Sequence, residues 1–212
     1  VQTFETFTTG AVNGQPALGW KSVNKLYDPA NGVLDPANLM RNWEIVNTPP
    51  PVPSNLGTKS VYMRTEEFGQ GNKLENWLFS QQVTVPANGQ LTFYTRTLTL
   101  GNQGSIFKVY VTTSADPTSA TATFTEIAEW NESELTASYN VFEQKVVDIK
   151  NAAGNFFPAG TQLYLAFVRE VTQPSTGVTG DAWFIDNVDV VEKCIAPTTL
   201  ASSSQNCAGA VL

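Results

Sequence analysis

The feature of this chain that most restricts its fold is an alternation of apolar and polar residues with a period of two. In the segment that begins at Gln90, Leu91 and Phe93 fall on one face and Tyr94 falls on the other. This alternation is typical of β-strands, whose successive side chains point to opposite faces. The same pattern recurs in residues 106–113, 140–149, 161–171 and 182–191.

Turn signals separate these segments, and helical periodicity is nearly absent. Glycine, proline and asparagine gather in residues 86–89, 101–104, 154–155, 158–160 and 174–177. Such residues favour turns because of their backbone geometry. We expect one short helical turn, within residues 131–139. Many short strands between turns predict an all-β antiparallel fold, either a two-sheet sandwich or a barrel.

The chain has 212 residues, a length that one β-sandwich domain commonly uses. We expect a single domain over residues 1–192. In residues 193–212 large apolar side chains become rare, so this tail is predicted to be a linker or the start of a following module. Cys194 and Cys207 both lie there. They pair either with each other or with partners in a following module, and their restriction to the tail suits an oxidising compartment.

A proline-rich stretch interrupts the strand pattern. Residues 24–57 contain Asp-Pro-Ala-Asn at 28–31 and again at 35–38, followed by the proline run of 48–53. We predict a long, proline-stiffened loop here. Each Asp-Pro-Ala-Asn is expected to form a turn in which Asp bonds the nearby backbone, with a ligand role as the alternative.

Composition excludes several kinds of chemistry. The chain has no histidine and only 2 cysteines, so it cannot form a Ser-His-Asp triad, a Cys-His pair or a His/Cys zinc site. Its formal net charge is −7, which argues against nucleic acid and anionic membrane surfaces as partners. No stretch approaches the ~20 apolar residues of a membrane span. Neutral, hydroxyl-rich ligands and calcium are better suited to a chain with this net negative charge.

Several motifs, taken in order, resemble one family. They are Phe4-Glu5, Gly19-Trp20, residues 75–80 and 83–93, then 107–114, 159–167 and the run Gly-Asp-Ala-Trp-Phe-Ile-Asp-Asn-Val at 180–188. The ordered set resembles the cleaved-adhesin domains, also called choice-of-anchor J domains, of Bacteroidetes surface proteins and gingipain-type proteases. It is also similar to MAM domains. The resemblance covers residues 1–192.

The resemblance implies a β-jelly-roll sandwich, often with bound calcium, and no catalysis of its own. The tail resembles the start of the fibronectin-type modules that often follow such domains. Glu and Asp positions that bind metal in related families fall here on Glu5 and Asp181, with Asp186 and Asn187 close by. Because calcium prefers several oxygen ligands, we expect these four residues to hold a structural calcium ion.

Asp186 carries a separate signal. Strict alternation over residues 183–190 would place it on the same side as Phe184, Val188 and Val190. A carboxylate among apolar side chains must be paired, displaced by a bulge or bound to a cation. The alternative to calcium is therefore that Asp186 and Asn187 form a polar bulge or edge.

Two of the five tryptophans have polar neighbours. Trp43 and Trp130 are therefore the candidates for an exposed pair, and exposed indole rings can stack on sugars. We nevertheless expect both to pack beneath loops, with sugar binding as the alternative. The remaining three, Trp20, Trp77 and Trp183, are expected in the core.

We do not expect an enzyme. Acids that might pair for hydrolysis occur at Glu66-Glu67 and in a series that we interpret as a solvated connecting segment, namely Glu126, Glu129, Glu132 and Glu134. The sequence instead predicts a calcium-stabilised, non-catalytic binding or adhesin module, expected to be monomeric. It would belong to a larger extracellular or cell-surface protein and contact host or environmental glycans or surface proteins. The alternatives are a carbohydrate-binding module that tethers an enzyme to polysaccharide and a passive structural spacer.

Overall fold

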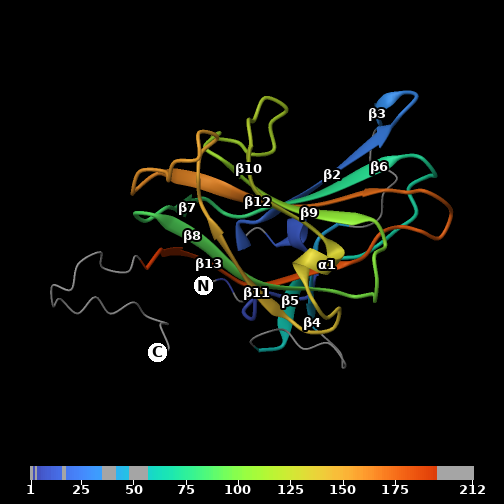
Figure 1. The fold of residues 1–212 in the computed structure, drawn as a ribbon, viewed down its shortest axis with the longest axis horizontal. Coiled ribbons are helices and arrows are strands. Elements are labelled where there is room, and N and C mark those ends of the chain that lie inside the picture. The colour runs from blue at the N-terminus through green and yellow to red at the C-terminus, as the bar shows by residue number, and fades with distance from the viewer. Residues whose placement is uncertain (1, 3, 16–17, 35–41, 48–56, 195–212) are drawn as a thin grey trace.

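The computed structural model describes residues 2, 4–15, 18–34, 42–47 and 57–194. Its regular elements are almost all β-strands, arranged in two layers (Figure 1). The second Asp-Pro-Ala-Asn, the proline run of 48–53, Cys207 and most of the predicted tail lie outside the described residues. The pairing of the two cysteines and the domain boundary near residue 192 therefore stay predictions.

One layer is a six-stranded antiparallel sheet with the strand order β1-β4-β5-β13-β8-β11. It is the lower layer in Figure 1. In that order the strands are β1 (Gly10–Ala11), β4 (Glu44–Asn47), β5 (Lys59–Met63), β13 (Trp183–Glu192), β8 (Gly89–Thr97) and β11 (Glu143–Asp148).

The other layer is a seven-stranded antiparallel sheet with the order β10-β9-β12-β6-β2-β3, and the short β7 pairs with β12 beside this path. Its strands are β10 (Thr125–Asn131), β9 (Ser105–Thr112), β12 (Gln162–Thr172), β6 (Lys73–Phe79), β2 (Lys21–Asp28), β3 (Gly32–Leu34) and β7 (Val83–Thr84). The predicted two-sheet antiparallel sandwich is therefore confirmed, together with its expected strands.

Two short helices accompany the sheets: η1 (Val12–Gly14) and α1 (Glu132–Leu135). The second lies within the predicted helical turn. Asn131 caps α1, because its side chain accepts hydrogen bonds from backbone N–H groups while Glu134 bonds back to the Asn131 N–H. No helix in the described part of the chain has the length and apolar character needed to cross a membrane.

The core between the sheets is rich in aromatic rings. Trp183 lies 5.5 Å from Trp43, 5.0 Å from Phe107 and 5.9 Å from Phe167, measured between ring centroids. All four side chains are fully buried. Tilted and edge-to-face contacts of this kind are the favoured geometry for aromatic pairs.

The expectation of a single long loop over residues 24–57 is wrong. The chain there forms the end of β2, all of β3 and all of β4. The first Asp-Pro-Ala-Asn is the turn between β2 and β3, in which the Asp28 carboxylate accepts a hydrogen bond from the Ala30 N–H at 2.7 Å. The strand pattern of β2 is hidden in the sequence because its inward-facing Asn24 is polar and bonds Asn76 of β6 at 2.8 Å.

Two further expectations need correction. Residues 125–131 are strand β10, so the acidic series is not a connecting segment throughout. In β13, the pairing register with β8 shifts between Asp186 and Asp189, and Asn187 has a positive φ of 50°. This bulge changes which face the later residues occupy. Phe184, before the bulge, faces away from the core and stacks on Tyr62, whereas Val188, after it, packs into the core.

Lys193 fastens the end of β13 to the neighbouring part of the sheet. Its ammonium group lies 2.9 Å from a carboxylate oxygen of Asp148, and its backbone N–H donates to the Asn88 carbonyl at 3.1 Å. Burial alone would raise the pKa of Asp148, but hydrogen bonds from Gln90, Lys193 and Lys150 outweigh it and lower the pKa to about 2. The residue that follows β13 is thus held to the sheet by an ion pair and a backbone hydrogen bond.

We expect Trp43→Ala to lower the free energy of unfolding by about 3–5 kcal/mol, because it leaves a large cavity between the sheets. Guanidinium denaturation measures this. Leu100→Ala is the control, since that side chain is 75% exposed and its loss should change stability by less than about 0.5 kcal/mol. Equal effects of the two variants would contradict the assigned core.

Stability should be nearly constant between about pH 6 and pH 8, because the chain has no histidine. A carboxyl group whose pKa is lowered by folding stabilises the fold above its unfolded pKa of about 4 and loses that contribution as the pH falls. We therefore expect the melting temperature to fall between about pH 4 and pH 2, and to fall less in Lys193→Met. A melting temperature that changes as steeply with pH between pH 6 and pH 8 as it does between pH 4 and pH 2 would contradict this.

Candidate functional site

Glu5 holds the N-terminal segment against the start of β5. Its carboxylate accepts hydrogen bonds from the backbone N–H groups of Thr58 at 2.8 Å and Lys59 at 2.6 Å. The Lys59 ammonium group in turn donates hydrogen bonds to the backbone carbonyl oxygens of Glu5, at 2.8 Å, and Phe7, at 2.7 Å. These contacts give Glu5 a structural role that needs no ion.

Asp181 is fully buried near the opposite end of β5. Its carboxylate accepts hydrogen bonds from three backbone N–H groups, those of Leu98 at 3.2 Å, Thr99 at 2.9 Å and Ala182 at 2.7 Å. Buried carboxylates are tolerated when such donors satisfy them. Asp181 therefore anchors the start of the loop that follows β8.

Gly180 explains the Gly-Asp motif. Its φ is +75°, and a Cβ added there would lie 2.4 Å from Ser105 Oγ and 2.8 Å from Arg169 Nη2. Only glycine combines this backbone conformation with such close approach. The fully buried Arg169 uses the space to donate from Nε to the Asp181 carbonyl and from Nη1 to Asn76 Oδ1, at 2.5 and 2.9 Å.

Glu132 is a buried carboxylate whose role the sequence pattern did not reveal. It is 3% exposed and accepts hydrogen bonds from the backbone N–H groups of Ser105, at 2.8 Å, and Gln103. Together with Asp181 it fixes both ends of the loop of residues 98–104. The available signal is the capping sequence that begins at Asn131, which places Glu132 at the first position of a helix.

Asp186 is fully buried at the bulge of β13, and its carboxylate accepts a hydrogen bond from the Asn187 N–H at 2.8 Å. The bulge predicted as the alternative to a cation is present. Asn187 follows it, and its side-chain oxygen is buried with no hydrogen-bond partner among the described residues.

Two of the predicted ligands, Glu5 and Asp181, lie toward opposite ends of β5. Glu5 contacts the first residue of β5, whereas Asp181 lies two residues before Trp183, which pairs with Met63 at the last residue of that strand. Four residues of strand span roughly 13 Å. Within the part of the chain that the structure describes, no three Asp, Glu, Cys or His side chains are placed to hold a metal ion. Calcium binding stays a prediction from the resemblance.

The alternative of an exposed tryptophan pair is wrong for Trp43. That side chain is fully buried, and its indole N–H donates to the Asn76 carbonyl at 3.2 Å. Trp130 is partly buried and packs against the core, with its ring 6.1 Å from that of Phe93. Trp130 lies in β10, where polar neighbours do not indicate exposure because successive residues of a strand occupy opposite faces.

A cluster of aromatic rings lies on the side of the seven-stranded sheet that faces away from the core. The Trp77 ring is 5.6 Å from Phe79 of the same strand, 5.3 Å from Tyr110 of β9 and 5.0 Å from Phe124. These rings pack around Ala166, whose small side chain in β12 lies between the two strands. We call this surface, defined by Trp77, Phe79, Tyr110 and Phe124, the outer aromatic face.

The rings of the outer aromatic face cover one another unequally. Phe79 is 1% exposed and Trp77 is 6% exposed, whereas Tyr110 and Phe124 are half-buried. The ammonium group of Lys25 lies 4.1 Å from the Trp77 ring centroid. A cation over an indole face is a favourable contact, worth about 1 kcal/mol at an exposed site. Burial lowers the pKa of Lys25, because it disfavours the charged ammonium form relative to the neutral amine.

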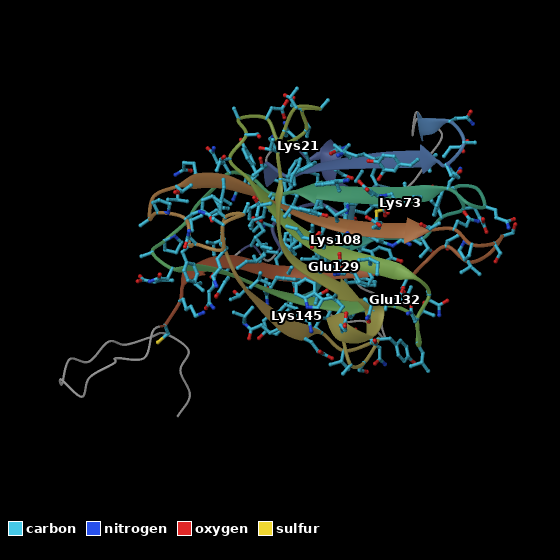
Figure 2. All side chains as sticks on the ribbon, turned by 45° about the horizontal axis from the view of Figure 1, so that its top comes forward. Lys21, Lys73, Lys108, Glu129, Glu132 and Lys145 are labelled. Carbon is cyan, nitrogen blue, oxygen red and sulfur yellow. The ribbon has the colours of Figure 1, made fainter. Side chains whose placement is uncertain are left out.

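Polar side chains surround the rings. The Tyr110 hydroxyl donates to Glu126 at 3.0 Å, and the Trp77 indole N–H donates to Glu75 at 2.9 Å. Lys108 lies 3.0 Å from Glu129. Figure 2 shows Lys108, Glu129, Lys73 and Lys21 spread across the strands of this sheet.

Ion pairing keeps the charges on this face close to balance. Burial alone would raise the pKa of Glu75, but hydrogen bonds from Lys73 and Trp77 outweigh it and lower the pKa. Burial raises the pKa of Tyr110, and its hydrogen bond to Glu126 adds to that effect. At neutral pH the face therefore presents a protonated phenol, carboxylates and ammonium groups around apolar rings.

The fold has clear structural relatives. The K1 cleaved adhesin domain of Lys-gingipain from Porphyromonas gingivalis W83 matches with a TM-score of 0.55 and 18% identity, covering 91% of this chain and 97% of that domain. The K3 domain of the same protein gives 0.52 and 18% with the same coverage. TmCBM61, solved with β-1,4-galactotriose, gives 0.49 and 16%, covering 91% and 95%. At 18% identity the two adhesin-domain matches establish a shared β-sandwich fold and no more.

Comparison at the level of sequence adds nothing to this. No family model matches the chain, and a search of curated proteins finds no match. The resemblance to cleaved-adhesin domains thus has a counterpart in the fold, while membership of that family stays a prediction.

Chelation tests the calcium prediction directly. A structural ion bound through Glu5 or Asp181 should make the melting temperature fall in EDTA and recover with added calcium, because a ligand that binds only the folded state stabilises it. Differential scanning calorimetry measures both. An unchanged melt would contradict the prediction and leave these carboxylates as acceptors for backbone N–H groups alone.

Proposed function

We propose that this protein is a non-catalytic binding module and that its ligand is a neutral glycan held on the outer aromatic face. The observation that carries the proposal is the cluster of rings around Trp77 on the sheet surface that faces away from the core. Trp77 and Phe79 are already buried by their neighbours, whereas Tyr110 and Phe124 keep part of their rings open to water. Two partly open rings on a packed aromatic base favour a ligand that covers them.

The surroundings of the rings favour a sugar over an apolar ligand. Pyranose rings have C–H faces that pack on aromatic rings and hydroxyl groups that both donate and accept hydrogen bonds. Glu126 and Glu129 are exposed acceptors at one side of the face, and Lys108 is a donor between them. A polar frame around an apolar platform is the usual composition of small-ligand sites.

The charges favour a neutral ligand. Three lysines, Lys25, Lys73 and Lys108, face four glutamates, namely Glu75, Glu126, Glu129 and Glu170, and several of these groups are already paired. A strongly anionic or cationic ligand would have to displace those pairs. Neutral hydroxyl groups can bond the same atoms without breaking them.

The acids of the face are poorly suited to hydrolysis. A glycosidase needs a carboxylic acid whose pKa is raised so that it can protonate the leaving group. The most buried carboxylate of the face, Glu75, has a lowered pKa instead, because Lys73 and Trp77 bond it. This supports binding without catalysis at Glu75. The resemblance to cleaved-adhesin domains supports an extracellular or cell-surface location.

Tyr110→Ala should weaken glycan binding by at least about 10-fold, because the ring on which a sugar stacks is lost together with the hydroxyl group that bonds Glu126. A glycan array identifies the ligand, and isothermal titration calorimetry then measures the affinity. Melting curves check that the variant is folded.

Tyr94→Ala is the matched control. Tyr94 is also a half-buried tyrosine in the middle of a strand, but it lies on the six-stranded sheet. Its loss should leave the affinity unchanged. The proposal fails if the array detects no glycan, or if Tyr94→Ala weakens binding as much as Tyr110→Ala does.

A further inference from the structure

A pocket of about 350 Å³ lies at one side of the sandwich, where edge strands of the two sheets come together. One wall comes from β10 of the seven-stranded sheet. The other comes from the end of β11 of the six-stranded sheet and from the turn that follows it. We call this the flank pocket, and its lining includes Glu126, Ile127, Asp148, Lys150, Asn151 and Ala152.

The flank pocket is open to solvent. Glu126 is exposed, and the side chains of Lys150 and Asp148 are 39% and 23% exposed. Ile127 and Asn151 are each partly exposed. A ligand can therefore reach charged, amide and apolar groups there without any rearrangement of the core.

The turn that forms one wall is held by hydrogen bonds of Asn151. Its backbone N–H donates to the Asn155 carbonyl and its carbonyl accepts from the Gly154 N–H, both at 2.8 Å. Its side-chain Oδ1 accepts from the N–H groups of Ala153 at 3.0 Å and Asn155 at 3.1 Å. Its Nδ2 makes no hydrogen bond to the described residues, so this amide is left to donate from a preformed wall.

Lys150 adds a second donor and balances charge. Its ammonium group lies 3.1 Å from Asp148 Oδ2 and 4.9 Å from the ring centroid of Phe156. An ammonium group has three N–H donors, so this ion pair leaves others for a ligand. Lys193 pairs with the same carboxylate. The ammonium groups of Lys150 and Lys193 thus balance the carboxylates of Asp148 and Glu126 around the pocket.

Glu126 connects the flank pocket to the outer aromatic face. It is the cross-strand partner of Tyr110 in the pairing of β10 with β9, so both side chains lie on the same face of the sheet. Its Oε2 accepts a hydrogen bond from the Tyr110 hydroxyl at 3.0 Å. Its Oε1 accepts none from the described residues. A molecule that lies on the Tyr110 ring therefore meets Glu126 next, and the pocket beyond it.

We propose that the flank pocket holds a second neutral sugar unit of the glycan that lies on the outer aromatic face, so that the protein selects an oligosaccharide over a single sugar. The inference rests on the proposed function. A hydroxyl group of the second unit donates to Glu126 Oε1, and its other oxygens accept from Asn151 Nδ2 and Lys150. Ile127 provides an apolar contact. The volume lies near the lower end of the range for small-ligand pockets, roughly 300–1,000 Å³, which suits one unit.

A length series of the glycan selected on the array tests the proposal. Its single sugar, disaccharide and trisaccharide are compared by amide chemical-shift titration, which also measures weak binding. We expect the affinity to rise at least about 10-fold from the single sugar to the trisaccharide, because linked units can occupy two adjoining sites together.

Two variants test the pocket itself. Asn151→Asp removes the amide donor and keeps the Oδ1 that holds the turn, and Lys150→Met removes the ammonium group and keeps most of the stem. Each should weaken the trisaccharide at least about 5-fold and leave the single sugar, bound on Tyr110, unchanged. Asn155→Asp is the matched control, since Asn155 is exposed in the same turn and does not line the pocket. It should change neither affinity.

Tyr110→Ala separates this proposal from the proposed function. That variant should weaken every member of the series. If it does so while Asn151→Asp and Lys150→Met alter none, the flank pocket is ruled out and the aromatic site stands. Equal affinity for the single sugar and the trisaccharide, or an equal effect of Asn155→Asp and Asn151→Asp, also overturns the pocket. If no glycan binds, or if Tyr110→Ala has no effect, both proposals fail.

Discussion

Contact between Trp183 of one sheet and Phe167 of the other, with ring centroids 5.9 Å apart, lies at the centre of the packing that joins the two layers. Each strand contributes alternate side chains to this shared core, so the remaining side chains must point outward. On β6 that rule sends Leu78 inward and Trp77 outward. The aromatic residues on the outer side are therefore a consequence of the strand register, and they need a role other than joining the sheets.

Much of the sandwich is predictable from sequence because its central strands alternate without interruption. The prediction failed where inward positions are polar. Asn24 of β2 and Asn76 of β6 face each other inside the sheet and bond, so the apolar pattern that marks a strand is missing there. It also failed for the faces of the residues after Asp186, because a bulge exchanges the two faces of β13. The residue pattern offered this bulge only as an alternative to a bound cation, since a buried carboxylate is compatible with both.

The candidate sites divide in the same way. The Gly-Asp motif at 180–181 is recognisable in the sequence, and the structure shows why glycine is needed beside Ser105 and Arg169. What the motif does could not be predicted, since two of the three donors to Asp181 come from residues more than eighty positions away, at Leu98 and Thr99. The flank pocket is likewise invisible in sequence, because its two walls come from different sheets and meet only in the fold.

The central claim is that the outward-facing rings of the seven-stranded sheet form a glycan-binding surface. Amide chemical-shift mapping of the protein with a glycan selected on an array tests it most directly. The account predicts that the largest shifts fall on the outward-facing residues of β6, β9 and β10, around Trp77 and Tyr110. Shifts confined to the six-stranded sheet, or no shifts at saturating glycan, would contradict it.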